Sequence, residues 1–305
     1  MNSFHDSWIK CYYTPEQEFK VDYNCRRNTN VHLYTESVRT CQIIRDTFPS
    51  EKFSVMLSGG LESEIMVRAF QQANIPIDIY IGRYERDYNL YDVSYAVTLC
   101  ESLQLPYKII DFNLTKFLDN DIVSYAQLAR ISEARLLPQL ALADLVDGMP
   151  IMGNGEPAPR RLQPDYETDP DSIWILDEDE NFWGWPRYFA IQNRTAIPEW
   201  CRYTSDMYNA WMNLRWFNYL ITNKIYGKTS TWSSKLFGYR EAYPELLFRK
   251  KLTGFELIEN KFQEVNIELD KLLPNQVSLT FTVEGFFNHE LHDIREVSTK
   301  HYRKT

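Results

Sequence analysis

The sequence predicts an α/β fold built on a doubly wound parallel sheet. Between residues 51 and 156, short apolar stretches typical of buried parallel strands alternate with stretches whose apolar residues recur at helical spacing. Such an alternation is typical of a sheet covered by helices, and the sequence shows no internal repeat of fixed period. A chain of 305 residues is long enough to bury such a core without disulfides or metals.

The predicted elements follow one another closely. FSVML (53–57) is typical of a buried strand, and after the break at SGG the apolar residues from Leu61 to Ala73 fall on one helical face. The elements expected next are a strand at 77–82, a helix at 91–104, a strand at 107–112, two helical stretches over 114–146 and a strand at 150–153.

The flanking regions differ from this core. Residues 1–50 alternate polar and aromatic side chains and predict a small strand-rich extension, followed by a helix over about 35–48. Residues 157–305 predict a mainly helical substrate or cap region. In it we expect an acidic hairpin at SIWILDEDENFWGW (172–185) and a buried helix at 204–221. The three predicted regions are 1–50, 51–156 and 157–305.

Composition excludes several classes of protein. The formal net charge of -9 disfavours general nucleic-acid binding, and no apolar run approaches the roughly 20 residues of a membrane span. The five cysteines are scattered without a CxxC pair, so zinc knuckles and paired redox cysteines are not expected. No histidine lies between His32 and His289, which disfavours histidine-based catalysis. The N-terminus shows no secretory signal pattern, so we expect a cytoplasmic protein.

Ser58-Gly59-Gly60 stands between the first strand and the helix that follows it. A strand that ends in such a loop places free backbone N–H groups and the positive end of the helix dipole at one point. Glycines let the backbone approach phosphate oxygens, and the hydroxyls of Ser58 and Ser63 add donors. The loop therefore predicts a phosphate site; the alternative is a plain strand-to-helix turn.

LSGGLES (57–63) resembles the SGGxDS signature of the N-type ATP pyrophosphatases, and within them the synthetase domain of asparagine synthetase. The spacing extends the resemblance, because GNGEP (153–157) falls where asparagine synthetases carry GxGxDE after their fourth strand. The resemblance implies the adenine nucleotide alpha hydrolase-like fold and an ATP site. The implied ATP-binding residues are Leu57, Ser58, Gly59, Gly60, Leu61, Glu62, Ser63, Gly82, Gly153 and Gly155.

Two acidic positions depart from the family pattern. Glu62 replaces the family aspartate, and Glu156, followed by proline, stands for the acidic residue of the second motif. The resemblance implies that Mg2+ is held near both carboxylates beside the phosphates of ATP. It also implies the reaction. A substrate oxygen attacks the α-phosphorus, pyrophosphate leaves, and ammonia or another amine captures the adenylated carbon.

A basic cluster follows in an otherwise acidic chain. Its members are Lys224, Lys228, Lys235, Arg240, Arg249, Lys250 and Lys251. The family places a lysine over the β- and γ-phosphates, and the candidates to hold pyrophosphate are Lys228, Lys235 and Lys250. The alternative is a solvated helical face, which is what charge runs usually are.

Three functions stay open at this point. The first is an ATP-dependent C–N ligase of the amidotransferase kind, acting on a small-molecule substrate. The second is another adenylating enzyme of the superfamily that modifies a nucleobase, and the lack of paired cysteines disfavours it. The third is a catalytically silent nucleotide-binding protein, favoured by Glu62. About 50 residues before the loop are too few for a glutamine amidase domain, so we expect a separate source of ammonia or amine.

Overall fold

The computed structural model describes residues 5, 8–13, 19–24, 26–157, 159–161, 174–215, 232–250, 252–273, 277–282 and 295–298. Four parallel strands form the central sheet: β3 (Phe53–Met56), β4 (Asp78–Tyr84), β5 (Tyr107–Phe112) and β6 (Met149–Met152). Their spatial order is β5-β4-β3-β6, and Val55 pairs with Ile79 on one side and with Ile151 on the other. Phe53 and Val55 are fully buried, as the apolar run predicts for a strand of a parallel sheet.

β3 and β6 meet at the switch point of the sheet. The chain builds outward from β3 through β4 to β5, and then returns to place β6 on the other side of β3. In open α/β sheets, ligands bind beyond the carboxyl ends of the strands at such a point. The loops that follow Met56 and Met152 therefore begin side by side. The predicted α/β class with a parallel sheet is confirmed.

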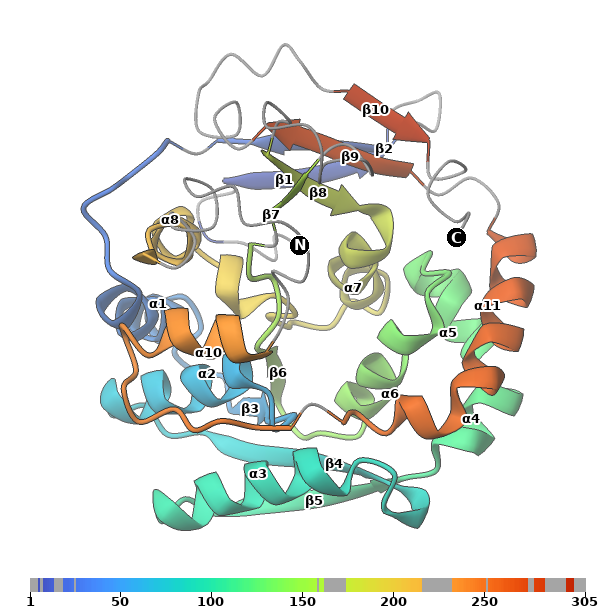
Figure 1. The fold of residues 1–305 in the computed structure, drawn as a ribbon, viewed down its shortest axis with the longest axis horizontal. Helices are drawn as coiled ribbons and strands as arrows, with labels where there is room; N and C mark the ends of the chain where they lie inside the picture. The colour runs from blue at the N-terminus through green and yellow to red at the C-terminus, as the bar shows by residue number, and fades with distance from the viewer. Residues whose placement is uncertain are drawn as a thin grey trace.

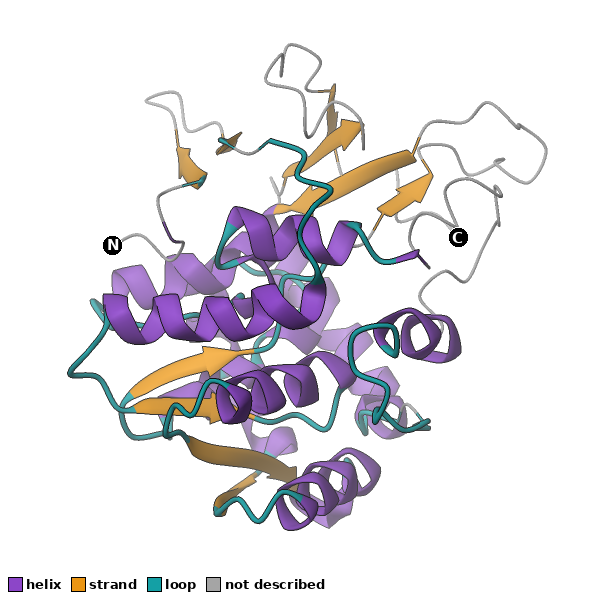
Figure 2. Cartoon of the chain, turned by 90° about the vertical axis from the view of Figure 1, so that its left-hand side faces the viewer, coloured by secondary structure: helices purple, strands orange, loops and turns teal. Residues whose placement is uncertain are grey.

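Helices lie on both sides of this sheet (Figures 1 and 2). The α-helices of the described residues are α1 (Leu33–Thr47), α2 (Leu61–Gln72), α3 (Leu90–Ser102), α4 (Leu114–Asn120), α5 (Ile122–Ala129), α6 (Pro138–Asp144), α7 (Glu180–Ile191), α8 (Ser205–Met212), α10 (Trp232–Tyr239) and α11 (Glu259–Leu272). The ring of Phe70 in α2 lies 6.0 Å from that of Phe53 in β3, centroid to centroid. The helices predicted around the sheet are confirmed, with three rather than two between 114 and 146. Within the described residues, no helix is both long and apolar enough to cross a bilayer.

Two smaller antiparallel sheets lie at one end of the molecule, at the top of Figure 1. β1 (Ile9–Tyr13) pairs with β2 (Phe19–Tyr23), which confirms the strand-rich N-terminal extension. The other sheet has the order β10-β9-β8-β7. Its strands are β7 (Pro159–Arg161), β8 (Trp174–Asp179), β9 (Val277–Thr282) and β10 (Arg295–Ser298).

Two predictions for the third region need correction. The hairpin expected at 172–185 is wrong, because β8 runs straight into α7 at Glu180 and pairs with β7 and β9 instead. Asp177, Glu178 and Asp179 lie within β8, and Glu180 begins α7. The buried helix expected at 204–221 ends at Met212, and residues 216–231 lie outside the described part of the chain.

Candidate functional site

The loop after β3 is confined by the main chain of α3. Gly59 has φ +84°, and a Cβ atom on it would lie 2.2 Å from the carbonyl oxygen of Asp92. Only glycine fits there, because the backbone is left-handed and the neighbouring atom belongs to another main chain. The loop is therefore held rigidly where it leads into α2.

Polar groups of the same loop converge over the first turn of α2. Gly60 caps the helix without a side-chain hydrogen bond, and its N–H donates to Ser58 Oγ over 3.3 Å. Ser58 Oγ lies 3.1 Å from Ser63 Oγ, which donates to the Gly60 carbonyl over 3.0 Å. The amides of the first helical turn have no partner within the helix. Hydroxyl and amide donors together suit an anion.

The loop after β6 lies against this helix start. A Cβ atom on Gly153 would stand 2.9 Å from Ser63 Cα, so glycine allows the two backbones to meet. Gly155 has φ +89°, and its carbonyl accepts a hydrogen bond from Arg202 Nε over 3.2 Å. The Asn154 carbonyl accepts from the Cys201 amide over 2.9 Å. The segment around residue 200 thus holds the second loop.

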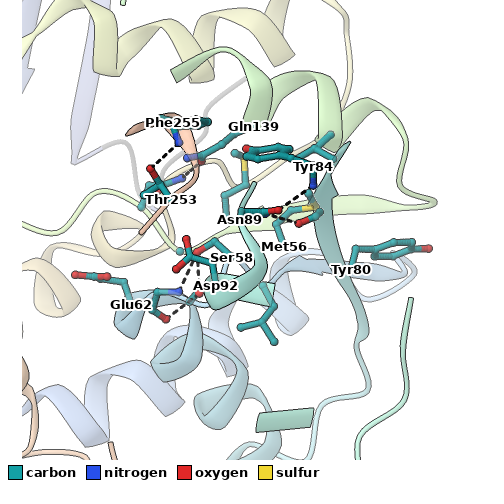
Figure 3. Close-up of a pocket in the computed structure, with 18 residues that line it drawn as sticks. Met56, Ser58, Glu62, Tyr80, Tyr84, Asn89, Asp92, Gln139, Thr253 and Phe255 are labelled. Carbon is teal, nitrogen blue, oxygen red and sulfur yellow. Dashed lines mark hydrogen bonds between the residues drawn. The ribbon is translucent and has the colours of Figure 1, made fainter. Parts of the chain in front are cut away.

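A pocket with a cavity volume of about 240 Å³ opens between these loops (Figure 3). Of the residues predicted to bind ATP, those that line it are Leu57, Ser58, Gly60, Glu62, Ser63, Gly82 and Gly153. The other three do not line it: Gly59 and Gly155 belong to the two loops, and Leu61 begins α2. In Figure 3, Ser58 and Glu62 lie toward one end, and Gln139 and Phe255 toward the other.

Lys235 joins the two predicted acidic residues. Its ammonium lies 3.1 Å from Glu62 Oε1 and 2.8 Å from Glu156 Oε1, and Tyr239 OH donates to Glu62 Oε1 over 3.0 Å. Burial opposes the charge on Glu62, but Lys235 and the hydrogen bonds outweigh it and lower the pKa of Glu62. Burial also opposes the charge on Lys235, and Glu156 and Glu62 raise its pKa well above the usual value. Glu62 and Lys235 are therefore both charged at neutral pH.

The other two lysine candidates are placed differently. The ammonium of Lys250 lies 5.7 Å from the centre of the Tyr91 ring on the surface, and its backbone N–H donates to Tyr95 OH over 2.9 Å. The structure thus does not bring Lys250 to Glu62. Lys228 lies outside the described residues. Their roles stay predictions.

Several lining residues were not found from the sequence. Thr253 and Phe255 come from the segment between α10 and α11, far from either loop in the chain. Asn89 closes the end of β4, since its side chain accepts from the Tyr84 amide over 2.8 Å and donates to the Gly82 carbonyl over 2.9 Å. The available signal in the sequence was an asparagine just before the helix predicted at 91–104. The sequence also held a signal for Tyr239, because this residue follows Lys235 by four positions and therefore lies on the same helix face.

Comparisons with known proteins give a faint likeness. No family model matches the chain, and no curated protein sequence matches it. The structure of the NMN synthetase from Francisella tularensis is similar at 13% identity and a TM-score of 0.33, covering 72% of this chain and 97% of that chain. The NH3-dependent NAD synthetase from Campylobacter jejuni subsp. jejuni NCTC 11168 is similar at 16% identity and a TM-score of 0.32, covering 76% and 93%. Likenesses at these scores carry no weight for this site, whose function rests on its own geometry.

Proposed function

We propose that the chain binds Mg-ATP in this pocket and adenylates a small acceptor, releasing pyrophosphate. The supporting observation is that Lys235 meets Glu62 and Glu156 where the two glycine loops converge beyond β3 and β6. A cation, two carboxylates and a helix N-terminus at a switch point suit a polyphosphate with its metal ion.

The two ends of the pocket suit the two ends of ATP. Ser58, Ser63 and the first-turn amides of α2 would bind phosphate oxygens. Met56, Leu142 and Met152 line the pocket elsewhere and offer an apolar surface to the adenosine. Gly82 leaves room for the Leu142 side chain in this apolar surface, because a Cβ atom on Gly82 would stand 2.6 Å from Leu142 Cδ1.

The donor set fits Mg2+. Glu62 and Glu156 bond one ammonium, so both carboxylates can reach a single cation position. Within the described residues no group of three or more His, Cys, Asp or Glu gathers at one point, so the remaining ligands would be phosphate oxygens and water. Magnesium is commonly bound through one or two carboxylates and substrate phosphates. When bound, it would neutralise charge on the leaving pyrophosphate.

The chain's own part in the reaction would be positioning and charge. The Lys235 ammonium would give up its place between Glu62 and Glu156 to Mg2+, and Lys235 would then contact the β- and γ-phosphates. The loop would hold the α-phosphorus in line with an acceptor oxygen. Such a transfer needs no histidine base. The resemblance to asparagine synthetase favours a carboxylate or carbonyl acceptor whose adenylated carbon is captured by ammonia or an amine.

Product analysis tests the proposal. Protein, Mg-ATP, ammonium and a panel of small carboxylates, amides and nucleobases are incubated together, and the nucleotides are separated by chromatography. We expect AMP and pyrophosphate, with turnover lowered at least about tenfold in Lys235→Ala, since one charge on the leaving group is lost. Lys261→Ala, which removes only a surface pair with Asp119, is the matched control. Lys228→Ala and Lys250→Ala test the other candidates.

The outcomes separate the alternatives. ADP and free phosphate would contradict adenylation. Tight ATP binding without turnover on any acceptor would favour a silent nucleotide-binding protein, whose carboxylates are neutralised by Lys235 itself. Turnover only with nucleobases would favour the base-modifying alternative.

A further inference from the structure

The segment between α10 and α11 crosses the face of the molecule that carries the phosphate loop (Figure 1, orange). We name residues 244–250 and 252–258 the crossing segment. Its Thr253 and Phe255 line the pocket, and the Phe255 ring stacks on Tyr84 with centroids 5.7 Å apart. Gly254 has φ +86°, and a Cβ on it would lie 2.6 Å from the Tyr88 carbonyl oxygen. The crossing segment is therefore packed closely on the strand and helix beside the pocket.

Arg249 connects this segment to the phosphate loop. Its side chain is only 6% exposed. One guanidinium nitrogen donates to the Gly59 carbonyl, and another forms an ion pair with Glu64 of α2. Burial lowers the pKa of Arg249 to about 10, partly opposed by Glu62, so the group stays protonated at neutral pH. A buried charge of this kind is retained only with good partners, and here one partner is the loop's own backbone.

The contact fixes the orientation of one peptide plane. In a trans peptide the C=O and N–H groups point in opposite directions. Since the Gly59 carbonyl points to Arg249, the N–H of Gly60 must point the other way, and it donates to Ser58 Oγ on the pocket wall. The guanidinium thus selects which side of the loop offers a donor to the pocket.

Arg68 provides an internal comparison. It pairs with the same Glu64 carboxylate over 2.6 Å, and it also reaches Glu245 at 3.5 Å. The two arginines therefore share one buried acid, but Arg249 also bonds the Gly59 carbonyl. Removing either one removes an ion pair with Glu64, and removing Arg249 also removes the loop contact.

We propose that Arg249 is a positioning residue that holds the phosphate loop in its anion-binding orientation and ties it to the crossing segment. That the ligand is a nucleotide rests on the proposed function, whereas the role of Arg249 in orienting the loop does not. Arg249 lies behind the loop, so it acts on a ligand through the Gly59–Gly60 peptide rather than by contact.

The test compares Arg249→Met with Arg68→Met. Hydrogen exchange of the amides at 58–63 is measured without nucleotide, and ATP affinity is measured by calorimetry. We expect Arg249→Met to speed exchange at Gly60 and weaken ATP binding, each by about tenfold or more, the effect of losing a hydrogen bond from a charged group. Arg68→Met should change both by less than about twofold, because the loop contact remains.

A second variant guards against a fold defect. Arg249→Lys keeps the charge beside Glu64, but a single ammonium cannot reproduce the arginine fork that reaches carboxylate and carbonyl together. We expect it to retain the melting temperature while loop exchange is still faster. Equal loop exchange in the Arg249 and Arg68 variants, or unchanged exchange in a folded Arg249→Lys, would overturn the proposal. Absence of ATP binding by the unmodified protein would instead contradict the proposed function, and the exchange result would still decide the role of Arg249.

Discussion

The loops after β3 and β6 look alike in sequence, yet they are held in different ways. Each contains a glycine in the left-handed region, Gly59 at φ +84° and Gly155 at φ +89°. A Cβ atom on the first would stand 2.2 Å from the Asp92 carbonyl oxygen in the main chain of α3, whereas one on the second would meet side-chain atoms of Arg202 and Glu199 at 2.9 and 3.0 Å. The main chain of a helix cannot shift to make room for a Cβ atom as readily as side chains can. The first loop is thus held more rigidly than the second, which is confined by side chains instead of main chain.

The two loops are also linked by ion pairs to one shared cation. Glu62 lies in the helix that follows the first loop, and Glu156 lies in the second loop. Lys235 of α10 forms an ion pair with each of them. Two carboxylates at this distance from one ammonium would repel each other without it. A residue of the C-terminal region therefore links the two loops that border the pocket.

The largest effect is expected for Gly59→Ala. The left-handed backbone costs about 1–2 kcal/mol with a side chain, and the contact with Asp92 adds about 1–3 kcal/mol of overpacking. The free energy of unfolding should fall by about 3 kcal/mol. Gly155→Ala should cost the backbone part, about 1–2 kcal/mol, and a smaller packing part than Gly59→Ala, because side-chain atoms of Arg202 and Glu199 rather than main chain must shift.

Urea unfolding of the two variants gives the measurement. Equal losses of unfolding free energy would mean that the main chain of α3 yields as readily as a side chain. The distinction between a more rigidly held first loop and a less rigidly held second loop would then be wrong.

An intermediate effect is expected for Lys235→Met, which leaves Glu62 and Glu156 without their shared cation. At neutral pH the loss should be about 2 kcal/mol. Glu62 has a lowered pKa in the folded chain, so its contribution to stability is present above its usual 4.5 and is lost as pH falls through the lowered value. Lys235 has a raised pKa, so its contribution is present below 10.5 and is lost as pH rises through the raised value.

The difference between unmodified protein and Lys235→Met should therefore be largest between pH 4.5 and pH 10.5, and it should shrink as the pH falls below 4.5 through the lowered pKa of Glu62. Chemical unfolding across this range measures it. Lys52→Met is the matched control, because Lys52 pairs with Asp78 over 2.7 Å at the exposed surface and should matter less. A pH-independent difference would show that Lys235 contributes packing rather than charge.

The sequence allowed the sheet and the loop to be predicted, because both depend on local signals. An apolar strand before SGG and an apolar helical face after it are sufficient to predict the loop and its place at the end of a strand. The meeting of Lys235 with Glu62 depends on residues 173 positions apart, and no local pattern indicates it. Arg249 and Lys250 show the limit most clearly. They are neighbours in one basic run, yet one is buried against the loop and the other is exposed, and the segment 246–250 has neither a helical nor a strand period that indicates which.

The smallest effect on stability, but the largest on binding, is expected for Gly60→Val. Gly60 has an ordinary φ of -72° at the start of α2, so a side chain brings no left-handed strain. A Cβ there would lie 3.3 Å from Ser58 Oγ and 3.6 Å from Glu62 Oε2, among side-chain atoms only. The unfolding free energy should change by less than about 1 kcal/mol.

The methyl groups of valine would instead occupy the place where these polar groups converge, which is the proposed phosphate position. ATP affinity measured by calorimetry should fall at least about a hundredfold, and Gly60→Ala should give an intermediate loss. The reverse is expected for Gly59→Ala, whose main effect is on the free energy of unfolding. If a folded Gly60→Val bound ATP unchanged, the open face of the loop would not be a phosphate site, and the rigid geometry enforced at Gly59 would serve only the packing of α2 against α3.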